Sequence, residues 1–131
     1  MAGKTAKGWT DEVGTLEGLG NLSTQTISNG SYLMAGIAYY AHSNDIRTEL
    51  PGTQTIETYW MDVLEGGYAN KNQYWLAAKY GGYKKPDPKA PPSAFNPSTD
   101  IWGGLDVKKT NIRRYNGYEL PNNYFPASKP D

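Results

Sequence analysis

The chain has 131 residues, with 13 basic and 13 acidic side chains and no cysteine. This length fits one domain or a piece of a larger protein, and zero net charge argues against a nucleic-acid binder held by phosphate contacts. Without cysteine, neither a disulfide nor a thiolate metal site can form. No apolar run reaches the roughly 18 residues that a transmembrane helix needs. Eleven Tyr and four Trp against two Phe indicate a small core of aromatic residues that carry polar groups.

Residues 1–30 are rich in glycine, threonine and serine. Trp9, Val13 and Leu16 follow one another at helical spacing, which is compatible with a loose helical turn. Glycines at positions 14, 18 and 20 disfavour a stable helix, since each interior glycine costs about 1 kcal/mol relative to alanine. We therefore expect an irregular N-terminal arm over residues 1–30, anchored by Trp9.

The strongest helical patterns lie in residues 31–83, which we expect to form a helical core. Within it, residues 31–43 (SYLMAGIAYYAHS) begin with Ser31 as a candidate N-cap and place Leu33 and Ile37 on one apolar face. Small residues at positions 35, 36 and 38 form a second face. Because small residues let a neighbouring element approach closely, we expect this helix to be central.

Residues 53–83 contain a short internal repeat. The dipeptide Tyr-Trp, a five-residue spacer and the tripeptide Gly-Gly-Tyr occur twice in succession. The first copy predicts a helix that is capped by Thr53 and ended by Gly66, because its apolar residues recur at helical spacing. These apolar residues are Ile56, Tyr59, Trp60, Val63 and Leu64.

The second copy predicts a helix over residues 70–80. Asn70 and Gln73 have the spacing of a capping box, and Gly81-Gly82 stops the helix. Two short helices joined by a glycine-containing turn predict an αα-hairpin. Trp60 and the second tryptophan, Trp75, are expected to lie in its core.

His42 is the single histidine of the chain. It could serve as a metal ligand or a general base. It could also be a polar residue near a helix C-terminus, where a cation is favoured. No second histidine stands at ligand spacing, so the structural interpretation is favoured.

Residues 84–131 differ from the core in composition, since they hold eight of the nine prolines and both phenylalanines. We expect a long extended segment, with a β-hairpin turning at Asn116-Gly117. Such a segment must be held by docking, because a long loop inside a compact domain is otherwise improbable. The expected docking residues are Phe95, Trp102, Tyr124 and Phe125. The predicted fold class is therefore mainly α, with about three short helices and a Pro-rich C-terminal segment.

Lys108, Lys109, Arg113 and Arg114 form a basic cluster, which could bind phosphate or an acidic partner or be a solvated strand face. The zero net charge favours the second interpretation. No nucleophile elbow, phosphate loop, dinucleotide fingerprint or zinc spacing is found. We therefore expect no enzyme activity and no catalytic, cofactor-binding or metal-binding residues.

Three blocks of the sequence resemble a segment of the PilY/PilC family of type IV pilus tip-associated adhesin and assembly proteins. They are AGIAYYAHSNDIRTELPGTQTIETYWMDVLE at 35–65, NQYWLAAKYGGY at 72–83 and LPNNYFPASKP at 120–130. The resemblance implies a fragment of a much longer secreted protein, with a variable N-terminal region and a C-terminal β-propeller. The matching segment lies before that propeller or at its entry.

The family often carries calcium-loop-like sequence after the Tyr-Gly-Gly-aromatic block and before Asn-Tyr-Phe. Here these places read KKPDPK at 84–89 and RYNGYELP at 114–121. Asp87, Asn116 and Glu119 do not supply the clustered oxygen ligands that calcium requires. We therefore expect no cofactor in this segment.

The resemblance implies a non-enzymatic structural role in pilus biogenesis, adhesion and twitching motility at the pilus tip on the bacterial surface. The implied partners are the remainder of the same polypeptide with its propeller, minor pilins, and host or surface ligands. No nucleic acid and no membrane span are expected. Two alternatives stay open. The chain could be a free-standing virion or filament subunit, or a carbohydrate-binding module or hydrolase that uses exposed Tyr and Trp.

Overall fold

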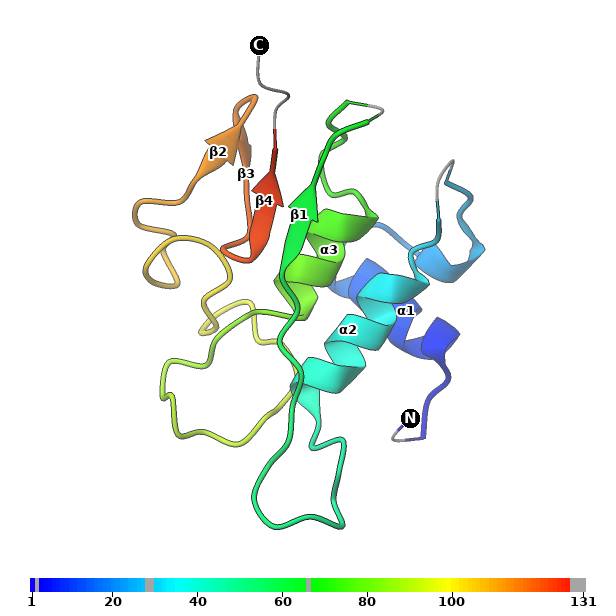
Figure 1. Cartoon of the computed structure of the whole chain (residues 1–131), viewed down its shortest axis with the longest axis vertical. Coiled ribbons are helices and arrows are strands. Elements are labelled where there is room, and N and C mark those ends of the chain that lie inside the picture. Colours follow the sequence, from blue (N-terminus) through cyan, green and yellow to red (C-terminus); the bar gives the residue numbers. More distant parts are fainter. Residues whose placement is uncertain (2, 28–29, 66, 128–131) are drawn as a thin grey trace.

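The computed structural model describes residues 1, 3–27, 30–65 and 67–127. The described part contains three α-helices, a short 3-10 turn and four short strands (Figure 1). The helices are α1 (Ala6–Glu17), α2 (Leu33–Ser43) and α3 (Gln73–Tyr80), and the turn η1 spans Leu22–Thr24. The strands are β1 (Trp60–Asp62), β2 (Arg114–Tyr115), β3 (Tyr118–Glu119) and β4 (Tyr124–Pro126). The fold is therefore a small mixed α/β unit rather than the mainly α fold that we predicted.

Helix α1 corrects the expectation of an irregular arm over residues 1–30. The Thr5 hydroxyl caps its start by accepting from the Gly8 amide at 3.1 Å, and Gly18, at φ 73°, ends it in the left-handed region. Gly14 does not weaken this helix in its context. A Cβ at Gly14 would lie 1.9 Å from the carbonyl oxygen of Gly20, so glycine lets the chain fold back closely.

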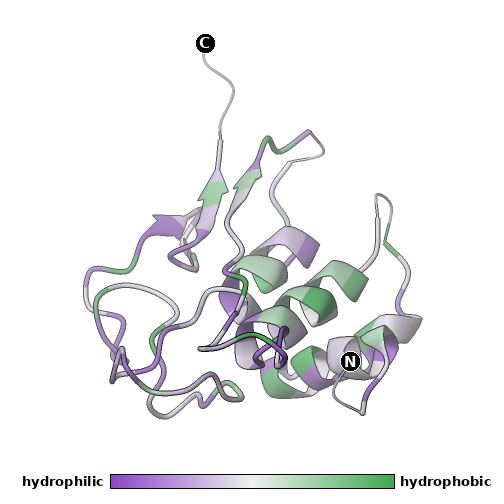
Figure 2. Cartoon of the chain, turned by 60° about the horizontal axis from the view of Figure 1, so that its bottom comes forward, coloured by the Kyte–Doolittle hydropathy of each residue, from purple (hydrophilic) through white to green (hydrophobic). Residues whose placement is uncertain are grey.

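Helix α2 is central, as its small-residue face predicted, and it packs against both α1 and α3. Figure 2 shows hydrophobic residues along it. A Cβ at Gly36 would lie 2.2 Å from the Thr10 hydroxyl oxygen, so the two helices meet at this glycine. Ile37, expected on the buried face, is instead 50% exposed. The Ser31 hydroxyl accepts from the Leu33 amide at 2.9 Å, although Tyr32 occupies the N-cap position.

The predicted helix over residues 53–65 does not form, and with it the αα-hairpin is wrong. This segment is extended, and its backbone amides donate hydrogen bonds to three other segments of the chain. The Ile56 amide donates to Ala41 O at 2.9 Å, the Thr58 amide to Gly81 O at 2.8 Å, and the Trp60 amide to Asn123 O at 2.8 Å. Thr53 therefore caps no helix, and Gly66 lies outside the described residues. β-branched residues in this segment favour the extended conformation as well.

Helix α3 forms close to where the sequence predicted it. Its N-cap is Asn72, whose side-chain oxygen accepts from the Tyr74 and Trp75 amides, both at 2.9 Å, rather than an Asn70–Gln73 capping box. The helix ends at Tyr80, just before the glycine pair. Both glycines are needed for close packing, because a Cβ at Gly81 or Gly82 would meet Thr58 or Asn123 at 2.9 Å or less.

The C-terminal segment contributes three strands to two small sheets. β4 pairs in parallel with β1, in the register Trp60–Tyr124, Met61–Phe125 and Asp62–Pro126. β2 and β3 form an antiparallel hairpin around Asn116-Gly117, which confirms the predicted turn. The strands lie together on one side of the helices (Figure 1).

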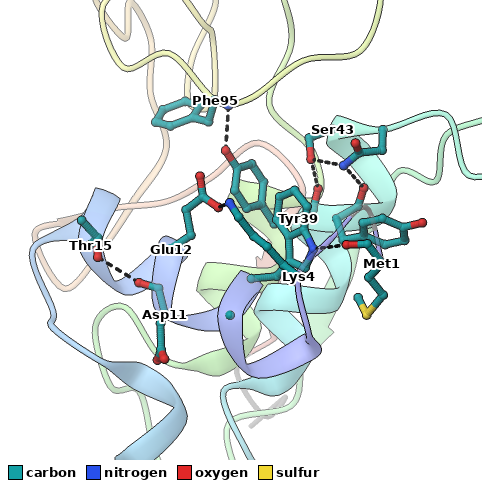
Figure 3. A network of polar contacts seen from close by, with 12 residues as sticks. Met1, Lys4, Asp11, Glu12, Thr15, Tyr39, Ser43 and Phe95 are labelled. Atoms are coloured by element: carbon teal, nitrogen blue, oxygen red, sulfur yellow. Dashed lines mark hydrogen bonds and ion pairs between the residues drawn. The ribbon is translucent and has the colours of Figure 1, made fainter.

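Tyr39 of α2 occupies the centre of the core, with no exposed surface. Its ring lies edge-on to Trp9 and Tyr80, with ring centroids 5.5 and 5.4 Å away. Its hydroxyl accepts from the Phe95 amide at 3.0 Å, which fastens the C-terminal segment to the helices (Figure 3).

The predicted docking residues fall into two groups. Phe95 and Tyr124 are buried and Trp102 packs against the core, as expected. Phe125 is 41% exposed, because strand alternation turns it to the side opposite Tyr124. The segment that follows residue 83 is thus anchored through Phe95, Trp102 and Tyr124.

We predict that Gly36→Ala lowers the free energy of unfolding by about 1–3 kcal/mol, because the added methyl group pushes α1 and α2 apart. The control is Gly8→Ala in α1, where the nearest atom to a new Cβ is 3.5 Å away. This control should be neutral or stabilising, by up to about 1 kcal/mol, because alanine favours a helix. Urea unfolding of both variants checks this. Equal stability of the two variants would contradict the close contact.

Candidate interaction surface

The ammonium of Lys79 on α3 is enclosed by aromatic rings and a carboxylate. It lies 4.2 Å from the centroid of the Trp102 ring and 5.3 Å from that of Phe95. It also forms an ion pair with Glu17, the last residue of α1. The side chains of Lys79 and Glu17 are only 8% and 4% exposed. One cation thereby joins α1, α3 and the C-terminal segment.

The carboxylate of Glu17 collects three polar contacts. Lys79 pairs with Oε1, the Tyr80 hydroxyl donates to the same oxygen at 2.8 Å, and Lys71 Nζ lies 3.0 Å from Oε2. Burial raises the pKa of Glu17, but the charge and hydrogen bond of Lys79 and the other donors outweigh it, and the net pKa lies below 4.5.

The two members of this pair respond differently to burial. Burial lowers the pKa of Lys79, and the opposing effect of Glu17 does not fully restore it. We take the pair as ionised, because a carboxylate that accepts three hydrogen bonds from donors is held in its charged form.

His42 is held between two backbone segments. Its Nδ1 lies 3.1 Å from Ile56 O and its Nε2 lies 2.6 Å from Tyr83 O. The ring also stands edge-on to the Tyr83 ring, with centroids 4.7 Å apart. Both nitrogens therefore face backbone carbonyls, and the residue fastens the extended segment to the end of α3. This geometry supports the structural interpretation of His42.

The basic cluster is divided among internal contacts. The Arg113 guanidinium donates to three backbone carbonyls in residues 121–124, at 2.7 to 3.2 Å. Lys109 and Arg114 both lie beside the Glu119 carboxylate, at 3.0 and 3.7 Å. Lys108 alone of the four is exposed without such a contact in the described structure. The arrangement favours a solvated face over a phosphate site.

The carboxylates of the C-terminal segment are also separated. Asp100 is 1% exposed and accepts from Lys85 at 2.7 Å and from the Asn96 amide at 2.8 Å. Asp106 accepts from the Thr110 amide and hydroxyl. Among the described residues, no three His, Cys, Asp or Glu side chains gather as a metal site would require.

Neither tryptophan of the internal repeat offers an open aromatic platform. Trp75 is 2% exposed and donates its indole N–H to Glu119 O at 3.0 Å. Trp60 is partly buried and stacks on Tyr74, with ring centroids 4.6 Å apart and planes at 12°. Trp60 lies on β1 and not on a helix, so its predicted helical environment is corrected.

Two open cavities of the described structure are lined in part by polar side chains. One of about 670 Å³ lies beneath the Pro-rich loop and is lined by His42, Tyr83 and Lys85, all of which already have partners. The other, of about 590 Å³, lies between the end of β1 and the start of α3 and is lined by Asp62, Leu64 and Tyr74 among others.

A row of exposed apolar side chains lies on the β1–β4 ribbon. We call it the outer face, and it consists of Tyr59, Met61, Val63 and Phe125. Their exposed fractions are 61%, 71%, 57% and 41%. Trp60 and Asp62 alternate with these residues and point inward, where the Tyr124 hydroxyl donates to Asp62 at 2.6 Å. Clustered apolar residues on a surface mark a candidate interaction site.

The signal for this face was present in the sequence as an alternation. Residues 59–63 read Tyr-Trp-Met-Asp-Val, which has period two as well as helical spacing. The helical interpretation hid the face, because it placed Tyr59 and Trp60 on the same side. Among the described residues, no helix is long and apolar enough to cross a membrane.

Comparison with known proteins confirms the predicted resemblance to the PilY family. Over 76 residues, 55% of this chain, the sequence is 45% identical to the type IV pilus biogenesis factor PilY1 homolog of Xylella fastidiosa strain Temecula1. The chain spans only 6% of the length of that relative. No family model and no solved structure matches the chain.

We predict that Glu17→Gln destabilises the protein by about 3–5 kcal/mol at neutral pH, because it leaves the buried Lys79 charge without its counter-ion. Wild-type stability should fall as the pH drops below about 4.5 toward the lowered pKa of Glu17, since protonation removes the same charge. The variant should lose less stability over that window. Urea unfolding across the acid range measures both effects.

The control for this prediction is Glu65→Gln, at an exposed position that makes no ion pair in the described structure. It should unfold with the wild-type stability and acid dependence. A Glu17→Gln protein with an unchanged acid slope would show that the pair is not ionised in the folded state.

We predict that the chain binds no calcium at micromolar concentration, because its carboxylates are separated and engaged by basic groups and backbone amides. Calorimetric titration of the metal-free protein checks this. A saturable site would contradict the prediction, and Asp87→Asn, Asp100→Asn and Asp106→Asn variants would then locate it.

Proposed function

We propose that this chain is a non-enzymatic structural segment of a type IV pilus biogenesis protein. The observation that carries the proposal is the 45% identity over 76 residues to a protein named as a type IV pilus biogenesis factor. We further propose that it acts in pilus assembly, adhesion and twitching motility, as part of a secreted protein at the pilus tip.

The way that polar groups are used supports a structural role. Glu17, Lys79 and Asp100 are buried and hydrogen bonded to one another or to neighbouring groups. These charged groups therefore stabilise the fold. His42 bridges two carbonyls in the same manner. Side chains that serve the fold are poorly placed to serve as acids, bases or nucleophiles, which need free access to a substrate.

The proposed partners are the remainder of a longer polypeptide, including a β-propeller domain, and minor pilins. The support is the small share of the relative's length that this chain spans, 6%, together with the exposed apolar outer face. Host or surface ligands remain proposed targets of the whole protein. The carbohydrate-binding alternative loses its basis at Trp75, because a buried indole offers no face to a sugar.

Inactivation of the gene in the bacterium that encodes this chain tests the proposal. Cells without it should lose surface pili in sheared fractions, should spread less by twitching and should adhere less. The wild-type gene should restore all three properties. Glu17→Lys should not, because a second buried cation beside Lys79 destabilises the segment.

The matched control is Lys108→Ala, which alters an exposed cation without an ion-pair partner in the described structure. It should restore piliation fully. Normal piliation, adhesion and twitching in cells without the gene would contradict the proposed function.

A further inference from the structure

Strand β1 has one edge that is paired and one that is open. The Trp60 amide donates to Asn123 O at 2.8 Å, and Asp62 O accepts from the Ala127 amide at 2.7 Å, so the backbone of residues 60 and 62 faces β4. In a parallel ladder the intervening residues direct their N–H and C=O groups the other way. No described residue hydrogen bonds with the backbone N–H or C=O groups of Tyr59, Met61 or Val63.

The other edge of the same ribbon is closed. On β4, the Tyr124 amide donates to Pro121 O at 3.1 Å, and Tyr124 O accepts from the Arg113 guanidinium at 2.7 Å. Arg113 therefore guards that edge against further pairing. Exposed edges are usually blocked by such a charge, by proline or by a covering loop. Residues 59–63 contain no Lys, Arg or Pro, so β1 lacks this protection.

We propose that the open edge of β1 is an acceptor for an extended strand of another polypeptide, which adds to the ribbon by main-chain hydrogen bonds. The edge offers the amide and carbonyl groups of Met61, flanked by those of Tyr59 and Val63. These backbone groups can pair only with a chain whose N–H and C=O groups have the same spacing, which is a β-strand. A groove built from side chains alone would not make this selection.

The side chains around the edge define the incoming strand. On one side lies the apolar outer face, where Met61 is 71% exposed and Tyr59 61% exposed. On the other side the cavity of about 590 Å³, lined by Asp62, Leu64 and Tyr74, can receive a side chain. A strand with apolar residues at alternate positions fits this arrangement, because alternate side chains point to opposite faces.

Charge at the two ends of the edge selects the partner further. Glu57 precedes β1, where its Oε1 accepts from Asn123 Nδ2 at 3.1 Å, and Glu65 follows β1; both residues are exposed. A second copy of this chain would pair poorly. Antiparallel pairing centred on Met61 would bring Glu57 toward the turn at Leu64 and Glu65 of the other copy, where Leu64 has φ 57°, and parallel pairing in register would set each Glu57 beside its equivalent. Like charges directly opposite destabilise a sheet. The strand that fits is one from a different sequence, with a basic residue at each end.

This inference goes beyond the proposed pilus role and does not depend on it. A panel of synthetic seven-residue peptides tests it on the full chain, read by fluorescence anisotropy. All peptides carry alternating valine and threonine, and they end in lysine or in glutamate at both termini. The lysine peptides should bind, and the glutamate peptides should bind at least roughly tenfold more weakly.

Two substitutions at one position separate main-chain pairing from apolar adhesion. Met61→Pro removes the outward N–H and leaves the hydrogen bonds of Trp60 and Asp62 with β4 in place. Met61→Thr retains that N–H. The proline variant should lose at least roughly tenfold in affinity relative to the threonine variant. Both variants should keep the wild-type thermal unfolding temperature, because the Met61 side chain is exposed.

The Met61 amide gives a direct measurement. Its hydrogen exchange should slow when a lysine peptide binds, while the already bonded Trp60 amide changes little. Three results would overturn the proposal. They are the absence of binding for every peptide up to millimolar concentration, equal binding by the proline and threonine variants, and binding without protection of the Met61 amide.

Discussion

The fold depends on one buried cation. The ammonium of Lys79 lies among aromatic rings from α3 and from the C-terminal segment, and it pairs with Glu17 at the end of α1. Removing such a charge from water is costly, and the cost is offset only where a carboxylate and π-electron faces surround it. Segments that are more than 60 positions apart in sequence must therefore assemble together.

Once these segments are in place, the hydroxyl and indole N–H groups of the aromatic residues find hydrogen-bond partners. Tyr39 receives the Phe95 amide, Tyr80 donates to Glu17, and the Trp75 indole donates to the backbone of Glu119. A core of tyrosine and tryptophan needs such partners, because an unpaired buried hydroxyl or N–H costs about 1–3 kcal/mol. The buried polar groups named above are thus hydrogen bonded within the fold. The outer face and the open edge of β1 remain available, which supports a role in contacts with other chains.

Local signals in the sequence predicted the parts of this fold that depend on local physics. Helices near 31–43 and 70–80 and the turn at Asn116-Gly117 are confirmed, since helical periodicity, small-residue spacing and turn preference act over a few residues, although the N-caps proved to be Tyr32 and Asn72. The helix at 53–65 failed because its apolar residues satisfy both periods and its backbone partners come from distant elements. Helix α1 was missed because its glycines were counted against a helix. The structure shows that Gly14 is needed where the chain folds back closely onto the helix. The Lys79–Glu17 pair joins residues too far apart for any local pattern to reveal.

We infer that the helices and the C-terminal segment form one cooperative unit around Lys79. Native-state hydrogen exchange in increasing denaturant measures this directly, with the Phe95, Ile101 and Tyr124 amides as reporters of the segment and Tyr39 and Ala77 of the helices. We predict that all five amides open with the same free energy, equal to that of global unfolding. Opening of the first three at a much lower free energy, with Tyr39 and Ala77 still protected, would show that the C-terminal segment unfolds separately from the helices.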